Sequence, residues 1–237
     1  QVDILITEGT MLGRKNEAVL LESDIENNVV EALRKSKYVY ALCSSTDIDR
    51  LRALHNACKE TGRTFVCDSY QYSVLDIFNK YTLSERYKFN RVFKLINYKT
   101  KNVYQKLLHT GFLVMVRPSS YSRIKRMMCT YNDQPSALIY SMWQGYHNGT
   151  QEQINEDIVK IRQLFGGNIY DGTRDGFHTS GHASVETLQM VCRCVKPRLG
   201  IVPIHKDANT SFKCLPIADV FCVVESDVVI DNINIRV

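Results

Sequence analysis

The sequence predicts an α/β protein built around a parallel, Rossmann-like β-sheet. Strand-like and helix-like segments alternate along most of the 237 residues. The helical segments have the length, about 10–15 residues, that crossovers between parallel strands require. In addition, the segments Tyr38–Ser44 and Ala137–Met142 are almost entirely apolar. Strands of this kind are covered on both faces, which is typical of a parallel sheet between two layers of helices.

The elements of the N-terminal part follow from local signals. The apolar segment Asp3–Glu8 predicts a strand. A helix is expected at Ser23–Ser36, because Ser23 is followed three residues later by Glu26 in a capping-box pattern. A second helix is expected at Asp47–Gly62, whose apolar residues recur at helical spacing before a closing glycine. The other elements predicted here are strands at Tyr38–Ser44 and Thr64–Asp68 and a helix at Ser73–Tyr81.

The remaining elements continue the alternation after a less regular stretch at Thr82–Thr100. The long helix at Glu152–Phe165 ends at a pair of glycines. The tail Val220–Asn234 alternates β-branched and polar residues, which predicts two short strands. The others are helices at Val103–His109, Tyr121–Thr130 and Val185–Cys194, and strands at Phe112–Arg117, Ala137–Met142 and Leu199–His205.

Composition narrows the class of protein. The chain is 44% hydrophobic and 23% charged, which is ordinary for a globular protein that is not embedded in a membrane. It has no apolar run of about 18 residues and no signal-peptide pattern. None of its eight cysteines forms a CxxC pair, so we expect reduced thiols and a cytoplasmic location rather than a cysteine zinc cluster. Because the chain opens on Gln1 and directly on a strand, we expect a fragment, or a chain trimmed at its N-terminus.

The formal net charge of +5 permits contact with nucleic acid without requiring it. Basic residues gather in Lys80–Lys106, with tyrosines and phenylalanines between them. Such a mixture suits a phosphate backbone with exposed bases. The alternative interpretation is a solvated helix face with an aromatic side that packs on the core.

Polar residues follow most of the predicted strands. The carboxyl ends of parallel strands meet at one edge of the sheet, where ligands of open α/β sheets bind. We therefore expect Ser45, Arg117 and Ser141 at this edge, as hydrogen-bonding partners of phosphate or hydroxyl oxygens. The alternative is that such residues only cap the following helices.

Histidines supply the most specific signal. His178 and His182 lie four residues apart in Gly176–Ser184, and His205 ends an apolar segment after an intervening helix. The order of loop, helix and strand predicts that His182 and His205 meet at one edge of a sheet. His178 and His182 could pair on a helix, but the Thr-Ser-Gly between them favours a loop.

Three segments together carry a resemblance to a known family. They are Asp3–Thr10 (DILITEGT), His178–Ser184 (HTSGHAS) and Ile201–His205 (IVPIH). In this order they resemble motifs A, B and C of the beta-CASP branch of the metallo-β-lactamase superfamily, which includes RNase J and the endonucleases that cleave messenger RNA at its 3′ end. By this resemblance, residues 11–175 are a beta-CASP domain. Residues 1–10 and 176–237 are the C-terminal part of a metallo-β-lactamase αββα domain.

The resemblance also implies roles for individual residues. Glu8 orients His182, and His182 donates a proton to the leaving oxygen. His205 is a zinc ligand of a site that holds two ions in the complete protein. The residues implied to hold the substrate phosphate are His178, Ser180 and Gly181.

The chain departs from the family pattern in one major respect. The His-x-His-x-Asp-His zinc motif is absent, and in the family it precedes motif A. The implied activity is that of a zinc-dependent phosphodiesterase on RNA, single-stranded where it enters the site, and this chain alone is expected to be inactive. We expect it to associate with the missing N-terminal half or with itself, because strands around Leu199–His205 and Val220–Ile230 would expose apolar faces.

Two other functions fit the same sequence. One is a nucleic-acid-binding module that keeps the fold without metal or catalysis. The other is a small-molecule α/β enzyme, although Glu8–Gly13 matches a glycine-rich phosphate loop poorly. Each key residue also has a structural alternative: Glu8 as a turn acid, His182 as a loop residue and His205 as the end of a strand.

Overall fold

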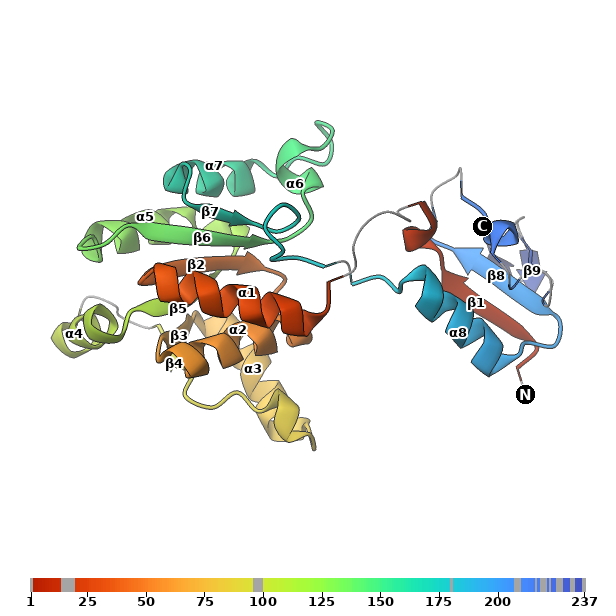
Figure 1. Cartoon of the computed structure of the whole chain (residues 1–237), viewed down its shortest axis with the longest axis horizontal. Coiled ribbons are helices and arrows are strands. Elements are labelled where there is room, and N and C mark those ends of the chain that lie inside the picture. Colours follow the sequence, from red (N-terminus) through yellow and green to blue (C-terminus); the bar gives the residue numbers. More distant parts are fainter. Residues whose placement is uncertain are drawn as a thin grey trace. The chain divides into compact units, whose positions relative to one another are not determined.

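The computed structural model divides the chain into two compact units (Figure 1). The terminal unit consists of residues 1–19 and 180–237, and the central unit of residues 20–179. The residues that the structure describes are 2–13, 20–95, 100–179, 181–206, 210–215, 217, 221, 223–224, 228–230 and 233–235.

The central unit contains a six-stranded sheet in the order β4-β3-β5-β2-β6-β7, and all of its neighbouring strands are parallel. This confirms the predicted α/β class and the parallel sheet. The strands are β2 (Tyr38–Cys43), β3 (Thr64–Cys67), β4 (Phe93–Lys94), β5 (Phe112–Val116), β6 (Ser136–Ser141) and β7 (Ile169–Asp171).

Helices cover both faces of this sheet. Buried residues of α1, α2 and α3 share one core, and those of α4, α5 and α7 share the other. The helices are α1 (Glu22–Lys35), α2 (Ile48–Thr61), α3 (Ser69–Tyr81), α4 (Lys101–Thr110), α5 (Tyr121–Thr130), α6 (Gly145–Asn148) and α7 (Glu156–Phe165).

Strand β2 shows why the sheet needs both layers. Its six residues are all buried. Tyr38, Tyr40 and Leu42 belong to one core, whereas the residues that alternate with them belong to the other. A strand without a polar face is stable only where helices exclude water from both sides.

Several helices begin where a side chain caps them rather than where the apolar pattern begins. The backbone amide of Leu21 donates to Asp24 Oδ2 at 2.9 Å, so Ser23 is not the N-cap of α1 as predicted. Asp68 accepts from the Gln71 amide, and α3 therefore starts four residues before the predicted Ser73. Conversely, Asn155 caps α7, so the predicted start of that helix at Glu152 is too early.

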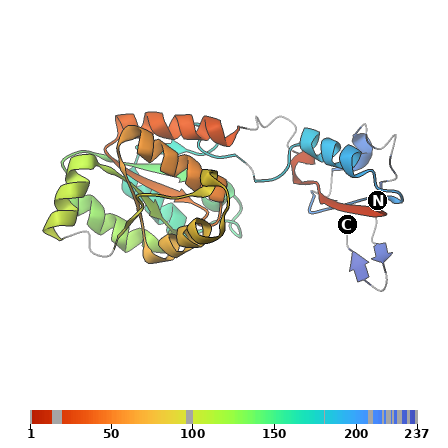
Figure 2. The same ribbon diagram turned by 90° about the horizontal axis from the view of Figure 1, so that it is seen from below.

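The terminal unit contains a two-stranded parallel sheet. Strands β1 (Ile4–Glu8) and β8 (Gly200–Ile204) pair in the register Ile4↔Gly200 to Glu8↔Ile204. Helix α8 (Val185–Val195) precedes β8, and Leu188 and Cys192 of this helix share a small core with Ile201. An antiparallel hairpin of β9 (Val228–Ile230) and β10 (Ile233–Ile235) follows, drawn as two short arrows in Figure 2.

The exposed apolar residues of this unit differ from those predicted. The four residues Gly200–Pro203 of β8 are buried, so the predicted exposure of residues 199–205 is wrong for most of that strand. The reason is that α8 and the segment around Phe212 pack on it. Leu199, the first residue of the predicted segment, is exposed, and so are Val2, Ile6 and Met190 elsewhere in the unit. Part of the predicted segment 220–230, namely residues 220, 222 and 225–227, lies outside the described residues.

Among the described residues, none of the helices combines the length and the apolar character needed to cross a bilayer. The cysteines that the structure describes with their side chains are free thiols. Cys43, Cys58 and Cys67 are buried near the sheet of the central unit, and burial raises the pKa of the Cys43 and Cys67 thiols to about 12. These thiols therefore act as small apolar side chains of the core.

Candidate functional site

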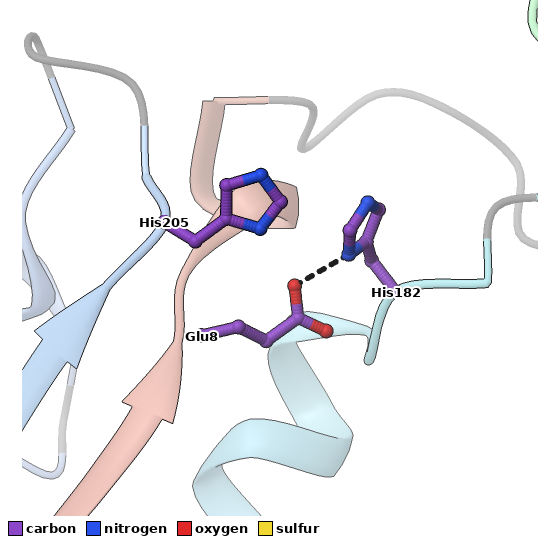
Figure 3. A group of neighbouring side chains, drawn as sticks. All are labelled: Glu8, His182 and His205. Atoms are coloured by element: carbon purple, nitrogen blue, oxygen red, sulfur yellow. Dashed lines mark ion pairs between the residues drawn. The ribbon is translucent and has the colours of Figure 1, made fainter.

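Three predicted residues meet at the carboxyl edge of the sheet in the terminal unit (Figure 3). Glu8 is the last residue of β1, and His205 directly follows the last residue of β8. Because Glu8 is in register with Ile204, the parallel pairing places His205 beside it. His182 comes from the loop before α8, and its ring centroid lies 5.3 Å from that of His205.

Glu8 holds the loop that carries His182. Its Oε2 lies 2.6 Å from Nδ1 of His182, and its Oε1 accepts the backbone amide of Ala183 at 2.8 Å. Burial alone would raise the pKa of Glu8, but the Ala183 amide, the Thr10 hydroxyl and His182 together lower it. Glu8 is therefore an ionised carboxylate at neutral pH. It fixes the orientation of the imidazole and leaves Nε2 on the ring edge that points away from it in Figure 3.

His205 has an unusual backbone conformation. Its φ is +49°, in the left-handed region that residues other than glycine seldom adopt. Thr10 supports this conformation, because its hydroxyl donates to the His205 carbonyl at 3.0 Å and lies 3.3 Å from Nδ1 of the same residue. A strained residue held by its neighbours at a cluster of reactive side chains is typical of functional sites.

Gly9 lets the two chain segments approach each other closely behind the cluster. A Cβ atom at this position would lie 2.8 Å from Cε2 of Phe212 and 3.1 Å from Cβ of Lys206. Both atoms belong to the segment that follows β8. Glycine between Glu8 and Thr10 is therefore required by packing, and it brings both neighbours to His205.

The cluster has the donor set of a metal site. Ligand atoms of Glu8, His182 and His205 all lie within 4.8 Å of one another, and in the part of the chain that the structure describes this is the one such group. Two imidazoles and a carboxylate are suitable ligands for a single zinc ion. The Glu8–His182 ion pair competes with that use, however, so His205 is the residue best placed to bind a metal. Two zinc ions would need more ligands than this cluster offers.

His178 lies in the central unit, where Arg50 contacts it. Nη1 of Arg50 is 3.5 Å from Nδ1 of His178 and also donates to the Phe177 carbonyl at 3.3 Å. Burial and the Arg50 charge lower the pKa of His178 to about 4. The ring is therefore neutral at neutral pH and cannot add positive charge for a substrate phosphate. Of the other predicted phosphate ligands nearby, Gly181 is exposed with open space around its Cα, and Ser180 lies outside the described residues.

The three residues predicted at the carboxyl edge of the central sheet have different surroundings. Ser141, which ends β6, is buried and donates to the Phe177 carbonyl at 2.5 Å. Ser45 is partly buried in the turn after β2, and its carbonyl accepts from the Gln71 side chain. Arg117 follows β5, pairs with Asp68 at 2.5 Å and remains partly exposed. Of the three, Arg117 is the one that presents a charged group to solvent.

The ion pair of Arg50 with Glu22 is a buried contact that the sequence analysis did not predict. The Arg50 side chain is fully buried, and Nε and Nη2 each meet a carboxylate oxygen of Glu22 at 2.9 Å. Nη1 also donates to the Ser141 hydroxyl. Arg50 lies next to the apolar positions of α2, and this was the available signal that it faces inward.

Compared with known proteins, the chain matches no family model and no curated protein.

Proposed function

We propose that Glu8, His182 and His205 are one side of the active site of a metal-dependent phosphodiesterase that acts on RNA, of the beta-CASP metallo-β-lactamase type. The observation that carries this proposal is the 2.6 Å contact between Glu8 Oε2 and His182 Nδ1, beside His205 at the same sheet edge. In this proposal the central unit is the beta-CASP domain, and the terminal unit is part of the metallo-β-lactamase domain.

Each residue of the cluster has a chemical task. Phosphodiester hydrolysis requires a proton for the departing oxygen. His182 supplies it from Nε2, and Glu8 keeps the ring in place and stabilises its charged form. His205 binds one zinc ion of the complete site. Zinc, when bound, supplies a Lewis acid that offsets the charge developing on the phosphate and lowers the pKa of water.

The remaining ligands would come from another part of the gene product. Strand β1 pairs with β8 alone among the described strands, and Ile6 in it is 45% exposed. We infer that the missing N-terminal half, or a second copy of the chain, covers this edge. Free thiols on both buried and exposed cysteines favour a reducing, cytoplasmic location.

The proton-donor role can be tested in the full-length gene product loaded with zinc. His182→Ala should slow cleavage of single-stranded RNA by about 10²- to 10⁴-fold. The same variant should cleave bis(4-nitrophenyl) phosphate almost normally, because nitrophenolate departs without protonation. His109→Ala, which removes an exposed histidine of α4, is the matched control. Equal losses on both substrates would show that His182 is not the proton donor.

A second function, a binding module without catalysis, is favoured by one observation. The described cluster offers three ligands and includes an ion pair that competes with metal. A full-length gene product that binds RNA tightly but does not cleave it, with zinc or manganese present, would support this alternative.

A further inference from the structure

A second group of side chains lies at the carboxyl edge of the central sheet, around the first turn of α3. It pairs cations with aromatic rings. The Arg117 guanidinium lies 4.8 Å from the ring centroid of Tyr70, and Nζ of Lys94 lies 5.2 Å from that of Tyr72. Both tyrosines belong to α3, two residues apart. We call Tyr70, Tyr72, Lys94, Arg117 and Arg123 the α3 patch.

The α3 patch is positively charged after its internal pairing is counted. Among the described residues, Asp68 is the acid that forms ion pairs with the patch, and it accepts from Arg117 at 2.5 Å and from Arg123 at 3.4 Å. Burial alone would raise the pKa of Asp68, but the Gln71 amide and the two arginines lower it, so it is ionised. Lys94 has no ion pair with any residue described in the structure. Three cations therefore face one carboxylate.

The patch is also open to solvent. Tyr70 is 50% exposed, and the side chains of Arg117 and Arg123 are 37% and 39% exposed. Asp68 is nearly buried by comparison. Asp68 therefore pairs with the two guanidinium groups from the buried side, while Tyr70 and parts of both arginine side chains remain in contact with solvent.

The topology places this patch where α/β sheets bind ligands. Strands β3 and β5 are neighbours, but their chains continue to opposite faces of the sheet. β3 leads into α3, which packs with α1 and α2, whereas β5 leads into α5 on the other side. A crevice at the carboxyl ends of two such strands is the usual ligand site of an open parallel sheet. Asp68 and Arg117 follow these two strands.

We propose that the α3 patch binds single-stranded RNA, with the cations on phosphates and the exposed face of Tyr70 under a base. Cations along a backbone and aromatic rings under the bases are the combination that single-strand binders use. The cation–π contact with Tyr70 also holds the Arg117 guanidinium beside the exposed ring. The inference relies on the proposed function for the choice of RNA, but not for the position of the site.

Matched substitutions within α3 can test it. Fluorescence anisotropy would measure binding of a labelled oligouridylate of about 12 nucleotides to the 237-residue chain. Tyr70→Leu should weaken binding about five-fold or more, by loss of stacking. Tyr81→Leu is the control, because Tyr81 is 79% exposed at the far end of the same helix. Equal effects of the two variants, or no effect of either, would overturn the proposal.

The charges are tested in the same way. Lys94→Gln combined with Arg123→Gln should weaken binding about ten-fold and reduce the slope of log Kd against log salt by about 1.4, or about 0.7 for each phosphate contact. Lys80→Gln removes one charge at the far end of α3 and should change neither quantity. Arg117 is left in place, because its removal would leave Asp68 poorly compensated. An unchanged salt slope in the double variant would contradict phosphate contact.

Two further measurements distinguish RNA binding by the α3 patch from binding to an anionic membrane, and this inference from the proposed function. Vesicles of phosphatidylcholine with phosphatidylserine should not bind the chain through the patch; loss of vesicle binding in the patch variants with unchanged RNA binding would overturn the RNA assignment. In the full-length gene product, His182→Ala should slow cleavage by about 10²- to 10⁴-fold and keep RNA affinity. Cleavage at the wild-type rate in that variant would contradict the proposed function alone, whereas patch variants with full affinity would contradict this inference alone.

Discussion

Glu8 and His182, from opposite ends of the chain, form one unit through the 2.6 Å contact between Oε2 and Nδ1. The other carboxylate oxygen accepts the amide of Ala183, so the acid holds both the ring and the backbone of the loop. A carboxylate that orients a histidine determines which nitrogen faces the substrate. In the proposed active site, Glu8 is therefore a positioning residue for His182.

Glu8→Gln tests this role without changing the size of the side chain. An amide still accepts the Ala183 amide through its oxygen, but it no longer stabilises a charged imidazole. We expect RNA cleavage by the full-length gene product to fall about 10- to 100-fold. Cleavage of bis(4-nitrophenyl) phosphate, which needs no proton donor, should change little. Unchanged RNA cleavage with a reduced melting temperature would indicate a purely structural role.

The same carboxylate makes the stability of the terminal unit depend on pH. The folded pKa of Glu8 lies below its ordinary value of 4.5. A depressed pKa contributes stability that is present above 4.5 and is lost as the pH falls through the folded value. The melting temperature of the wild type should therefore drop below about pH 4.5 more steeply than that of Glu8→Gln, as circular dichroism would measure. Parallel curves for the two proteins would contradict this.

Loss of the His205 imidazole should weaken zinc binding much more than it destabilises the fold. Asparagine, like histidine, tolerates positive φ, so His205→Asn removes the imidazole without straining the backbone. We expect zinc affinity in isothermal titration calorimetry to fall at least about ten-fold, with the melting temperature of the metal-free protein almost unchanged. His205→Val is the contrasting variant, because a β-branched residue is strained at φ +49° and should also lower that temperature. Equal zinc affinity in wild type and His205→Asn would remove His205 from the metal site.

The outcome of the sequence interpretation depended on how local each signal was. Strand β2 was predictable because its apolar character on both faces is a property of six consecutive residues. Strands β4 and β7 have two and three residues, and such short edge strands have no readable period. Capping by Asp68 and Asn155 moved two helix starts, since one hydrogen-bonded side chain outweighs the weak preference of a single turn.

In the candidate site, too, features set by the order of elements were predictable, and features set by tertiary contacts were not. The order of loop, helix and strand was enough to predict that His182 and His205 meet at one edge, and the family resemblance added Glu8. In the structure, β1 and β8 are parallel and in register at their carboxyl ends, which brings Glu8 and His205 together. The surroundings of His178 could not be predicted in this way. They depend on Arg50, whose burial is possible only because Glu22 and Ser141, distant in sequence, supply acceptors. Pairings of this kind are set by tertiary packing.

The buried Arg50–Glu22 pair should stabilise the central unit in a way that depends on both partners. Arg50→Met leaves Glu22 and the Ser141 hydroxyl without their partner, and we expect a loss of about 3–5 kcal/mol in urea unfolding. The exposed pair of Arg34 with Glu31 and Glu60 is the control, because Arg34→Met should cost less than about 1 kcal/mol. The double variant Arg50→Met/Glu22→Met should recover part of the loss. Additive losses in that double variant would show that the two residues do not act as a pair.

His178 gives the central unit an acid-sensitive element. Its pKa is lowered to about 4 in the folded state, mainly by burial and then by the charge of Arg50. An unfolded chain binds the proton near the ordinary value of 6.5. A depressed pKa means that full stability is present above pH 6.5 and is lost progressively as the pH falls towards 4. Because each pH unit in that window costs about 1.4 kcal/mol per group, the total is about 3 kcal/mol.

Urea midpoints measured from pH 7 to 4.5 should therefore fall in the wild type, and His178→Gln, which cannot titrate, should flatten that decline. His109→Gln removes an exposed histidine and should leave the decline unchanged. If His178→Gln follows the wild-type curve, the acid sensitivity belongs to other groups, and His178 is not held neutral by its surroundings.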